Sequence, residues 1–246
     1  MSEQKLLDII DCSVSYGPIQ ALNGVSLSVN QGEIVALLGA NGAGKTTLLQ
    51  TVSGLLRPTS GQIIYQGTDV TGVEAEKIVE KHLIHVPEHR QIFSTMTVLD
   101  NLYLGAYHHR KITNKQTIEE NIKKVFELFP ILSDRKDQMG GTMSGGQQQM
   151  LAIARGVMAE PDLLLLDEPT LGLAPLVAKD VLKLVGDLRE QFGTTILLIE
   201  QNLYASLRVA DRGYVISHGE IIKSGSSIEL LNDPEVKEAY LGHTVH

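Results

Sequence analysis

Residues 39–47 combine the residue types that surround phosphate groups. Glycines and small residues are followed by a lysine and two threonines: Gly39, Ala40, Asn41, Gly42, Ala43, Gly44, Lys45, Thr46 and Thr47. The run fits the spacing G-x-x-x-x-G-K-[ST], in which glycines let backbone N–H groups approach the phosphates. The lysine of such a loop reaches the β- and γ-phosphates, and the hydroxyl after it binds Mg²⁺. We therefore predict that this loop binds a nucleotide together with Mg²⁺.

The residues on either side of the loop predict the elements that hold it. An apolar strand is expected over residues 34–38 and an apolar helix over residues 48–56. The amino end of that helix adds partial positive charge beside the phosphates. The whole chain has a net charge of -8, but exposed charges are screened beyond about 8 Å. Lys45, Mg²⁺ and the loop amides, which act at contact distance, therefore attract an anionic nucleotide more strongly than the acidic surface repels it.

A second candidate group is the acidic pair Asp167 and Glu168, which follows an apolar strand predicted over residues 163–166. The end of the strand places Asp167 where it can hold the Mg²⁺ shell. Glu168 lies one step beyond, where it can polarise an attacking water molecule. Strands often end in acids, so the pair alone is weak evidence for a catalytic site. The phosphate loop in the same chain strengthens that interpretation.

A third candidate is a run of small and polar residues before an apolar helix over residues 150–158: Ser144, Gly145, Gly146 and Gln147. The amino end of a helix can offer backbone amides to an anion. Serine is also a good helix cap. The motif alone favours the simple cap.

Short apolar or β-branched runs alternate with helical spacing along the chain, which predicts an α/β fold with a mostly parallel sheet. Strands are expected over residues 6–10, 25–29, 34–38, 62–65, 83–86, 163–166, 195–199 and 213–216. The early strands, before the loop and shortly after it, resemble an antiparallel layer. Residues 90–143 contain few strand-like runs, so we predict a helical insert there.

Composition limits the class of protein. The 246 residues are enough for one large domain or one domain with an inserted lobe. Acidic residues outnumber basic ones, 29 to 21, which argues against a general nucleic-acid binder. The single cysteine, Cys12, excludes an intrachain disulfide and is expected to be buried or half-buried. No apolar run approaches the ~20 residues of a membrane-spanning helix, so we expect a cytoplasmic chain.

Together these motifs resemble the ATP-binding cassette (ABC) ATPases over essentially the whole chain. The resemblance implies ATP and Mg²⁺ as ligands, and an aromatic stacked on adenine at Tyr16. It makes residues 144–147 the family signature loop, with Met143 in place of the usual leucine. It implies a phosphate-loop core with its antiparallel layer over residues 1–89 and 150–246, and a helical insert over residues 90–149. In this family two ATP molecules lie between head-to-tail subunits, and the insert contacts membrane partners.

Three positions depart from the common family pattern. Glu88 replaces the glutamine that senses the γ-phosphate and Mg²⁺, Ala174 replaces an aspartate, and Gln201 replaces a histidine. Glu88 adds a carboxylate near Asp167 and Glu168, which disfavours full ionisation unless Mg²⁺ compensates. Gln201 can donate a hydrogen bond but cannot titrate. We therefore expect hydrolysis to depend strongly on Glu168 and Mg²⁺ and weakly on Gln201, with Lys45 stabilising the charge that develops.

The departures resemble one branch, the ATPase subunits of branched-chain amino acid importers, in three runs: Pro87-Glu88, Leu171-Gly172-Leu173-Ala174-Pro175 and Glu200-Gln201-Asn202. That branch implies permease partners, a second, non-identical ATPase or a second copy of this chain, and an external solute-binding protein acting indirectly. It implies no nucleic acid, and a place on the inner face of the cell membrane. His89 stands where that branch usually has glycine.

Other functions remain open at this stage. A related importer of urea or amides and a lipid exporter belong to the same class of transporter. A soluble ABC ATPase acting on ribosomes or DNA, and a regulatory ATP binder with little turnover, belong to other classes. A basic cluster over residues 108–111 is more simply a solvated turn than a contact with lipid or permease.

Overall fold

The computed structural model describes residues 4–107 and 115–241, with side chains up to residue 237. Its strands form two sheets. The four-stranded antiparallel sheet has the order β2-β1-β4-β5, with bounds β1 Lys5–Tyr16, β2 Ile19–Asn30, β4 Ser60–Tyr65 and β5 Thr68–Asp69. The six-stranded sheet has the order β10-β9-β3-β8-β7-β6, with bounds β3 Ile34–Leu38, β6 Leu83–Val86, β7 Leu163–Asp167, β8 Thr195–Glu200, β9 Arg212–Ser217 and β10 Glu220–Ser226. Five strands of the second sheet are parallel, and β10 pairs antiparallel with β9.

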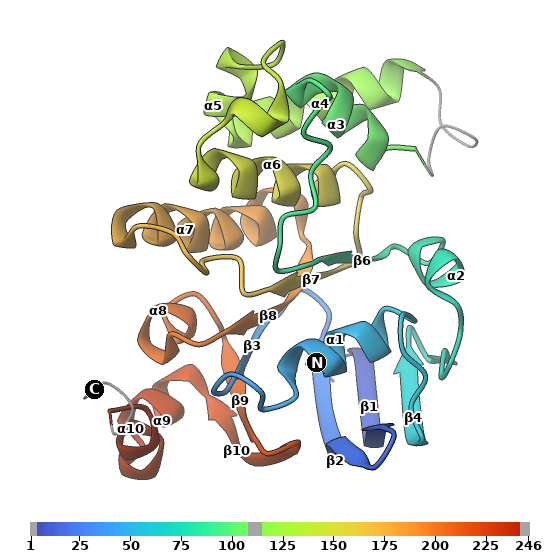
Figure 1. Cartoon of the computed structure of the whole chain (residues 1–246), viewed down its shortest axis with the longest axis vertical. Coiled ribbons are helices and arrows are strands. Elements are labelled where there is room, and N and C mark those ends of the chain that lie inside the picture. The colour runs from blue at the N-terminus through green and yellow to red at the C-terminus, as the bar shows by residue number, and fades with distance from the viewer. Residues whose placement is uncertain (1–3, 108–114, 242–246) are drawn as a thin grey trace.

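The helices divide between the core and a lobe above it (Figure 1). The core helices are α1 Lys45–Val52, α2 Ala75–Val79, α7 Pro175–Phe192, α8 Leu203–Leu207, α9 Ser227–Asn232 and α10 Pro234–Leu241. The lobe contains α3 Val98–Gly105, α4 Lys115–Leu128, α5 Pro130–Asp134, the short 3-10 helix η2 Gly140–Thr142 and α6 Gly145–Val157. Helix α6 therefore runs across the expected boundary at residues 149 and 150.

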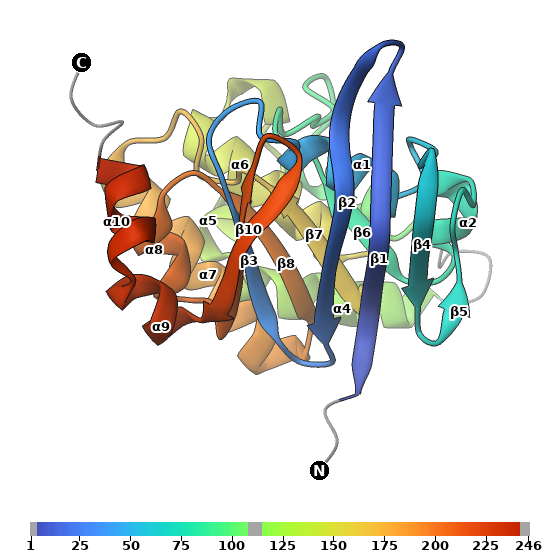
Figure 2. The same cartoon turned by 90° about the horizontal axis from the view of Figure 1, so that it is seen from below.

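Strands β3, β7 and β8 of the six-stranded sheet are buried along their whole length, because both faces of the sheet are covered there. Val35 and Leu37 of β3 pack toward α1 and the antiparallel sheet, whereas Ala36 and Leu38 pack with α6, α7 and α8. Continuous apolar strands are typical of parallel sheets buried on two sides. Figure 2 shows the antiparallel sheet as a separate layer in front of the parallel one.

The predicted α/β fold, with a parallel core, an antiparallel layer and a helical lobe, is confirmed. Strands β5 and β10 were not predicted, because β5 has two residues and β10 mixes polar residues and glycine with its isoleucines. Strands β1 and β2 are longer than expected, with twelve residues each. They pair with each other over this length, with several shifts of register. Cys12 is buried as predicted. The basic cluster over residues 108–111 lies outside the described residues.

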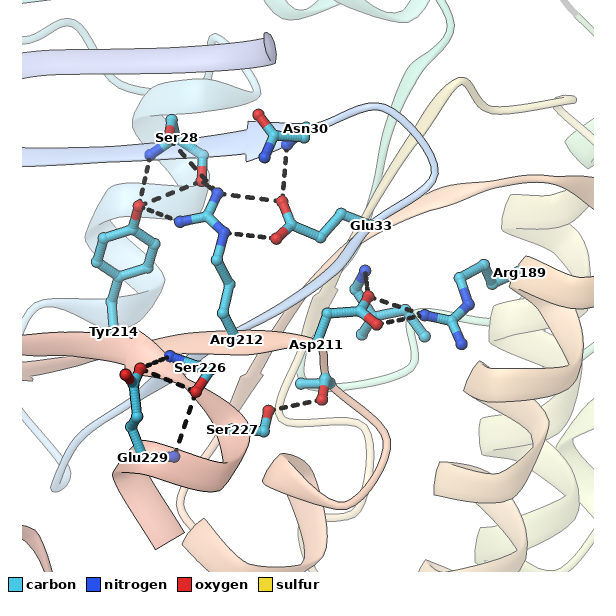
Figure 3. Close-up of polar contacts among 12 residues, drawn as sticks. Ser28, Asn30, Glu33, Arg189, Asp211, Arg212, Tyr214, Ser226, Ser227 and Glu229 are labelled. Carbon is cyan, nitrogen blue, oxygen red and sulfur yellow. Dashed lines mark hydrogen bonds and ion pairs between the residues drawn. The ribbon is translucent and has the colours of Figure 1, made fainter. Parts of the chain in front are cut away.

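A polar cluster joins the two sheets to the core helices (Figure 3). Arg212 on β9 pairs with Glu33 at 2.5 Å and donates to the carbonyl oxygen of Ser28 at 2.6 Å. Asp211 accepts from the backbone of Ile34 and pairs with Arg189 on α7 at 2.8 Å. These bonds connect β2, β3, β9 and α7, and so hold the antiparallel layer against the strand that carries the phosphate loop.

Among the described residues, no helix is long and apolar enough to cross a membrane.

Candidate nucleotide-binding site

The loop between β3 and α1 has a backbone that requires glycine at two positions. Gly42 has a φ of 78° and Gly44 a φ of 106°, both in the left-handed region. A Cβ on Gly44 would also lie 2.8 Å from the carbonyl oxygen of Ala21. Glycine avoids both the strain and the clash, so the chain can curve around an anion at the amino end of α1.

Lys45, the first residue of α1, is buried within this loop, with 4% of its surface exposed. Its Nζ donates to the carbonyl oxygens of Gly39 and Ala40, each at 2.9 Å. It also pairs with Oε1 of Glu168 at 3.0 Å. The predicted phosphate-binding lysine and the predicted water-polarising carboxylate are therefore in direct contact.

Glu168 follows β7 with a φ of 46°, a left-handed conformation that is costly for a residue other than glycine. Its second oxygen, Oε2, accepts a hydrogen bond from Nε2 of Gln201 at 2.6 Å. The same Nε2 donates to Oδ1 of Asn41 at 2.6 Å. Because β3, β8 and β7 are adjacent and parallel, their carboxyl ends meet at one edge. That edge brings the phosphate loop, Glu168 and Gln201 into one chain of contacts.

Asp167, the last residue of β7, is buried beside the loop. Its Oδ1 accepts from the Thr46 hydroxyl at 3.2 Å, and its Oδ2 has no hydrogen-bond partner among the described residues. Burial raises the pKa of Asp167 to about 6, and the charges of Glu168 and Glu88 add to the rise. A hydroxyl and an unpaired carboxylate oxygen are ligands that Mg²⁺ prefers. The two residues therefore fit the predicted magnesium site.

In the described part of the chain, no group of three or more histidine, cysteine or acidic side chains is placed to hold a metal ion. Mg²⁺ keeps several waters and is commonly bound through one or two carboxylates plus substrate phosphates.

The raised pKa of Asp167 predicts a pH dependence of stability in buffers without divalent cations. Between about pH 4 and pH 6 the folded protein keeps a proton that the unfolded chain releases, so stability falls as the pH rises through this window. Asp167→Asn lacks this proton. We therefore expect the free energy of urea unfolding of Asp167→Asn, relative to that of the wild type, to increase from pH 4 to pH 6.5.

The exposed acid Asp180 on α7 supplies the matched control, Asp180→Asn, whose unfolding free energy should follow the wild type at every pH. Parallel curves for Asp167→Asn and the wild type would contradict the prediction.

Glu88, which follows β6, lies at the same place. It lines a cavity of about 350 Å³ together with residues of the phosphate loop, Lys45, Thr46 and Glu168. About a third of its side chain is exposed, and it contacts His89 at 3.6 Å. The structure thus brings Glu88 near Asp167, as the sequence predicted, without direct bonding between them.

Two predicted groups do not line this cavity. Tyr16, at the end of β1, is 47% exposed rather than buried in the core. Ser144 caps α6, with its hydroxyl accepting from the backbone of Gln147 at 3.4 Å and its own N–H donating to the Gln147 side chain at 3.1 Å. Neither Tyr16 nor residues 144–147 line the cavity that holds Lys45.

Sequence reasoning missed the contact that shapes the turn after Glu168. Glu200, the last residue of β8, accepts from the backbone and hydroxyl of Thr170 at 3.0 and 2.7 Å. Burial raises the pKa of Glu200, while the two bonds from Thr170 oppose the rise. The sequence does show an acid, Glu200, at the end of a strand and next to Gln201. Its partner, Thr170, follows a different strand, so the contact could not be predicted from either run alone.

A glycine-rich loop that opens a helix at the carboxyl edge of a parallel sheet, with buried acids beside its lysine, defines the phosphate-loop nucleotide hydrolases. Within this class, the family model described as ABC transporter matches residues 22–171. The chain belongs to the ABC transporter family, as an ATP-binding and ATP-hydrolysing subunit.

Individual relatives agree along the whole chain. The chain is 46% identical to the high-affinity branched-chain amino acid transport ATP-binding protein BraG of Pseudomonas aeruginosa, covering 96% of this chain and all of that protein. It is 36% identical to the lipopolysaccharide export system ATP-binding protein LptB of Haemophilus influenzae, over 93% of each chain. A crystal structure of an ATP-binding cassette of an ABC transporter in its ADP conformation superposes with a TM-score of 0.85, at 31% identity over 97% of this chain and 99% of that one.

Proposed function

We propose that this chain is the ATPase subunit that energises a membrane importer of branched-chain amino acids. The observation that carries the proposal is the full-length, 46% likeness to a subunit named for that transport. The departures at Glu88, Ala174 and Gln201 support the same branch.

In the proposed mechanism, the phosphate loop and Lys45 bind the phosphates of ATP. Lys45 is already held by the carbonyl oxygens of Gly39 and Ala40, so its ammonium is aimed at the loop before substrate arrives. Phosphate oxygens then compete with Glu168 for Lys45. Glu168 released from this ion pair becomes free to orient a water molecule for in-line attack. Binding of ATP thus frees the carboxylate that orients the attacking water.

Thr46 and Asp167 are the residues that would hold Mg²⁺, with Glu88 close enough to feel the same charge. Bound Mg²⁺ would neutralise negative charge on the phosphates as it develops. Gln201 keeps the Glu168 carboxylate oriented through its 2.6 Å bond. Tyr16, exposed at the end of β1, is available to stack on adenine.

Residues 144–147 do not line the cavity that holds Lys45. This supports a head-to-tail dimer, in which a second chain supplies its signature loop. We propose that the second chain is a sister ATPase or another copy of this one.

A second cavity supports the permease contact. It measures about 730 Å³ and extends from Thr46 and Asp167 along β6 to α3 and α6. Four of its lining residues are large, apolar and exposed: Leu55, Val79, Phe93 and Tyr107. Exposed apolar patches of this kind mark partner sites. We propose that a cytoplasmic segment of the permease docks here, holding the chain on the inner face of the membrane, and that an external binding protein delivers the solute.

The test is uptake of radiolabelled leucine in a strain of the native organism that lacks this chain. We expect the wild-type chain to restore uptake and Glu168→Gln to leave it absent. A tagged chain, pulled from detergent-solubilised membranes, should recover two different permeases and a second cassette ATPase.

Normal leucine uptake without the chain would overturn the proposal. Recovery of two copies with a lipopolysaccharide-export permease pair would favour the exporter, which the likeness to LptB keeps as the second candidate. Recovery of soluble ribosomal partners alone would exclude both transporters.

A further inference from the structure

The turn after β7 carries Glu168 in a conformation that needs support. Its φ of 46° lies in the left-handed region, which is costly for glutamate and persists only where neighbouring groups hold it. The carboxylate at this position pairs with Lys45 at 3.0 Å. A change in the backbone of the turn would move that carboxylate relative to the phosphate loop, so the groups that fix the turn also fix Glu168.

Strand β8 fixes the backbone at the start of the turn. The N–H of Glu168 donates to the carbonyl oxygen of Ile199 at 3.0 Å, one step beyond the last paired residues of β7 and β8, Asp167 and Ile199. The residue after Glu168 is Pro169, which has no backbone N–H. The first backbone donor that can fix the turn after Glu168 is therefore the N–H of Thr170.

Glu200, the last residue of β8, accepts from that donor. Its Oε1 receives the backbone N–H of Thr170 at 3.0 Å and the Thr170 hydroxyl at 2.7 Å. Glu200 is buried, with 3% of its surface exposed, and the rest of β8 is apolar apart from Thr195. A carboxyl group buried in such a place is costly unless it is hydrogen-bonded. The two bonds to Thr170 therefore indicate what this acid does in the fold.

Three consecutive residues at the end of β8 hold the turn together. Ile199 fixes the backbone at Glu168, and Glu200 fixes the backbone two residues later. The side chain of Gln201 donates to Oε2 of Glu168 at 2.6 Å. Ile199 acts through its backbone, which no substitution removes. Glu200 is thus the residue whose side chain can be changed to test the backbone support of the turn.

We propose that Glu200 is a positioning residue for ATP hydrolysis, which acts through Thr170 to hold the turn that aims Glu168 at the attacking water. This rests on the proposed mechanism, in which Glu168 orients that water. Glu200 is not among the residues that line the cavity with Lys45. Its loss should therefore slow the chemical step without weakening ATP binding.

Steady-state ATP turnover and binding of a fluorescent ATP analogue, measured on the full chain, test this. Glu200→Ala removes the acceptor of both bonds and should lower kcat by about 10- to 100-fold, the cost of a misplaced catalytic group. The affinity for the analogue should stay within about twofold, because the phosphate loop and Lys45 are unchanged. Glu200→Gln keeps a carbonyl oxygen that can accept both bonds, and should retain kcat within about threefold.

A combined variant separates positioning from a purely structural role. In the Glu168→Gln parent the carboxylate is already absent, so adding Glu200→Ala should lower the residual turnover by no more than about twofold. Hydrolysis of radiolabelled ATP is sensitive enough to measure that residual rate. A residue that only supports the fold would lower turnover by the same factor with or without the Glu168 carboxylate, and that result would overturn the proposal.

Glu190→Ala, which removes an exposed glutamate of α7, is the matched control and should turn over ATP like the wild type. Thr170→Val guards against misfolding of Glu200→Ala. It removes only the hydroxyl bond and should lower kcat about fivefold. Wild-type kcat in a folded Glu200→Ala or, where that variant does not fold, in Thr170→Val would contradict the proposal. Leucine uptake tests the imported solute separately, so the two proposals can fail independently.

Discussion

Glu168→Gln is expected to lower ATP turnover at least 100-fold while ATP still binds. A positioned general base contributes about 10²- to 10⁴-fold, and the amide keeps the shape of the carboxylate without its charge. The change also removes the competitor for Lys45, whose Nζ lies 3.0 Å from Oε1. ATP affinity in the variant should therefore equal or exceed that of the wild type. Phosphate release and fluorescent-nucleotide titration measure the two quantities.

Two comparisons make this result specific. Glu190→Gln makes the same chemical change at an exposed position near the far end of α7 and should leave turnover unchanged. Gln201→Ala removes one donor to Glu168 and should cost about tenfold, since a hydrogen bond to a charged group contributes about 1.5 kcal/mol at the low end of its range. A loss in Gln201→Ala as deep as that in Glu168→Gln would show that the amide is essential to the chemistry.

Lys45→Met should both weaken ATP binding and destabilise the nucleotide-free protein. The lost charge-assisted bonds to phosphate predict a fall in affinity of about 10- to 100-fold. The methionine also leaves Glu168 buried without its cation, because both side chains are at most 7% exposed. Breaking one side of a buried ion pair costs about 3 kcal/mol. Urea unfolding without nucleotide measures this cost.

The double variant Lys45→Met/Glu168→Gln separates the two effects. Without the unpaired carboxylate it should regain most of the lost stability, yet it should still bind ATP poorly. Lys77→Met, which removes one partner of an exposed pair with Glu74, is the control and should change stability little because solvent screens that pair. Equal stability of Lys45→Met and the wild type would mean that the ion pair does not matter for the resting fold.

The order of strands decides which distant residues form the resting contacts. Asn41 and Gln201 are 160 residues apart in the chain, yet they share a hydrogen bond because β8 lies beside β3. Glu168 joins them because β7 lies on the other side of β8. Sequence motifs predicted that these residues serve one reaction. They did not predict that Glu168 would form an ion pair with Lys45.

The backbone conformation of residues 90 and 91 was not predicted from the sequence, for a related reason. A positive φ is normally signalled by glycine, but Arg90 and Gln91 adopt it without one. Contacts from Arg155, 64 residues away from Gln91, hold that conformation. His89, noted as a departure from the branch, directly precedes these two residues.

The amino-acid sequence was sufficient for the phosphate loop, the acidic strand end, the buried parallel strands and the family, because each is encoded in a short, contiguous run. The conformation of a glycine-rich turn, or of an apolar strand of five residues, follows largely from the residues of that run. Other features arise from the packed fold: the ion pair of Lys45 with Glu168, the joining of the two sheets through Arg212, and the hydrogen bonds from Arg155 to residues 90 and 91. These contacts depend on which strands and helices lie side by side, and that order is settled by burial of the whole core rather than by any single segment.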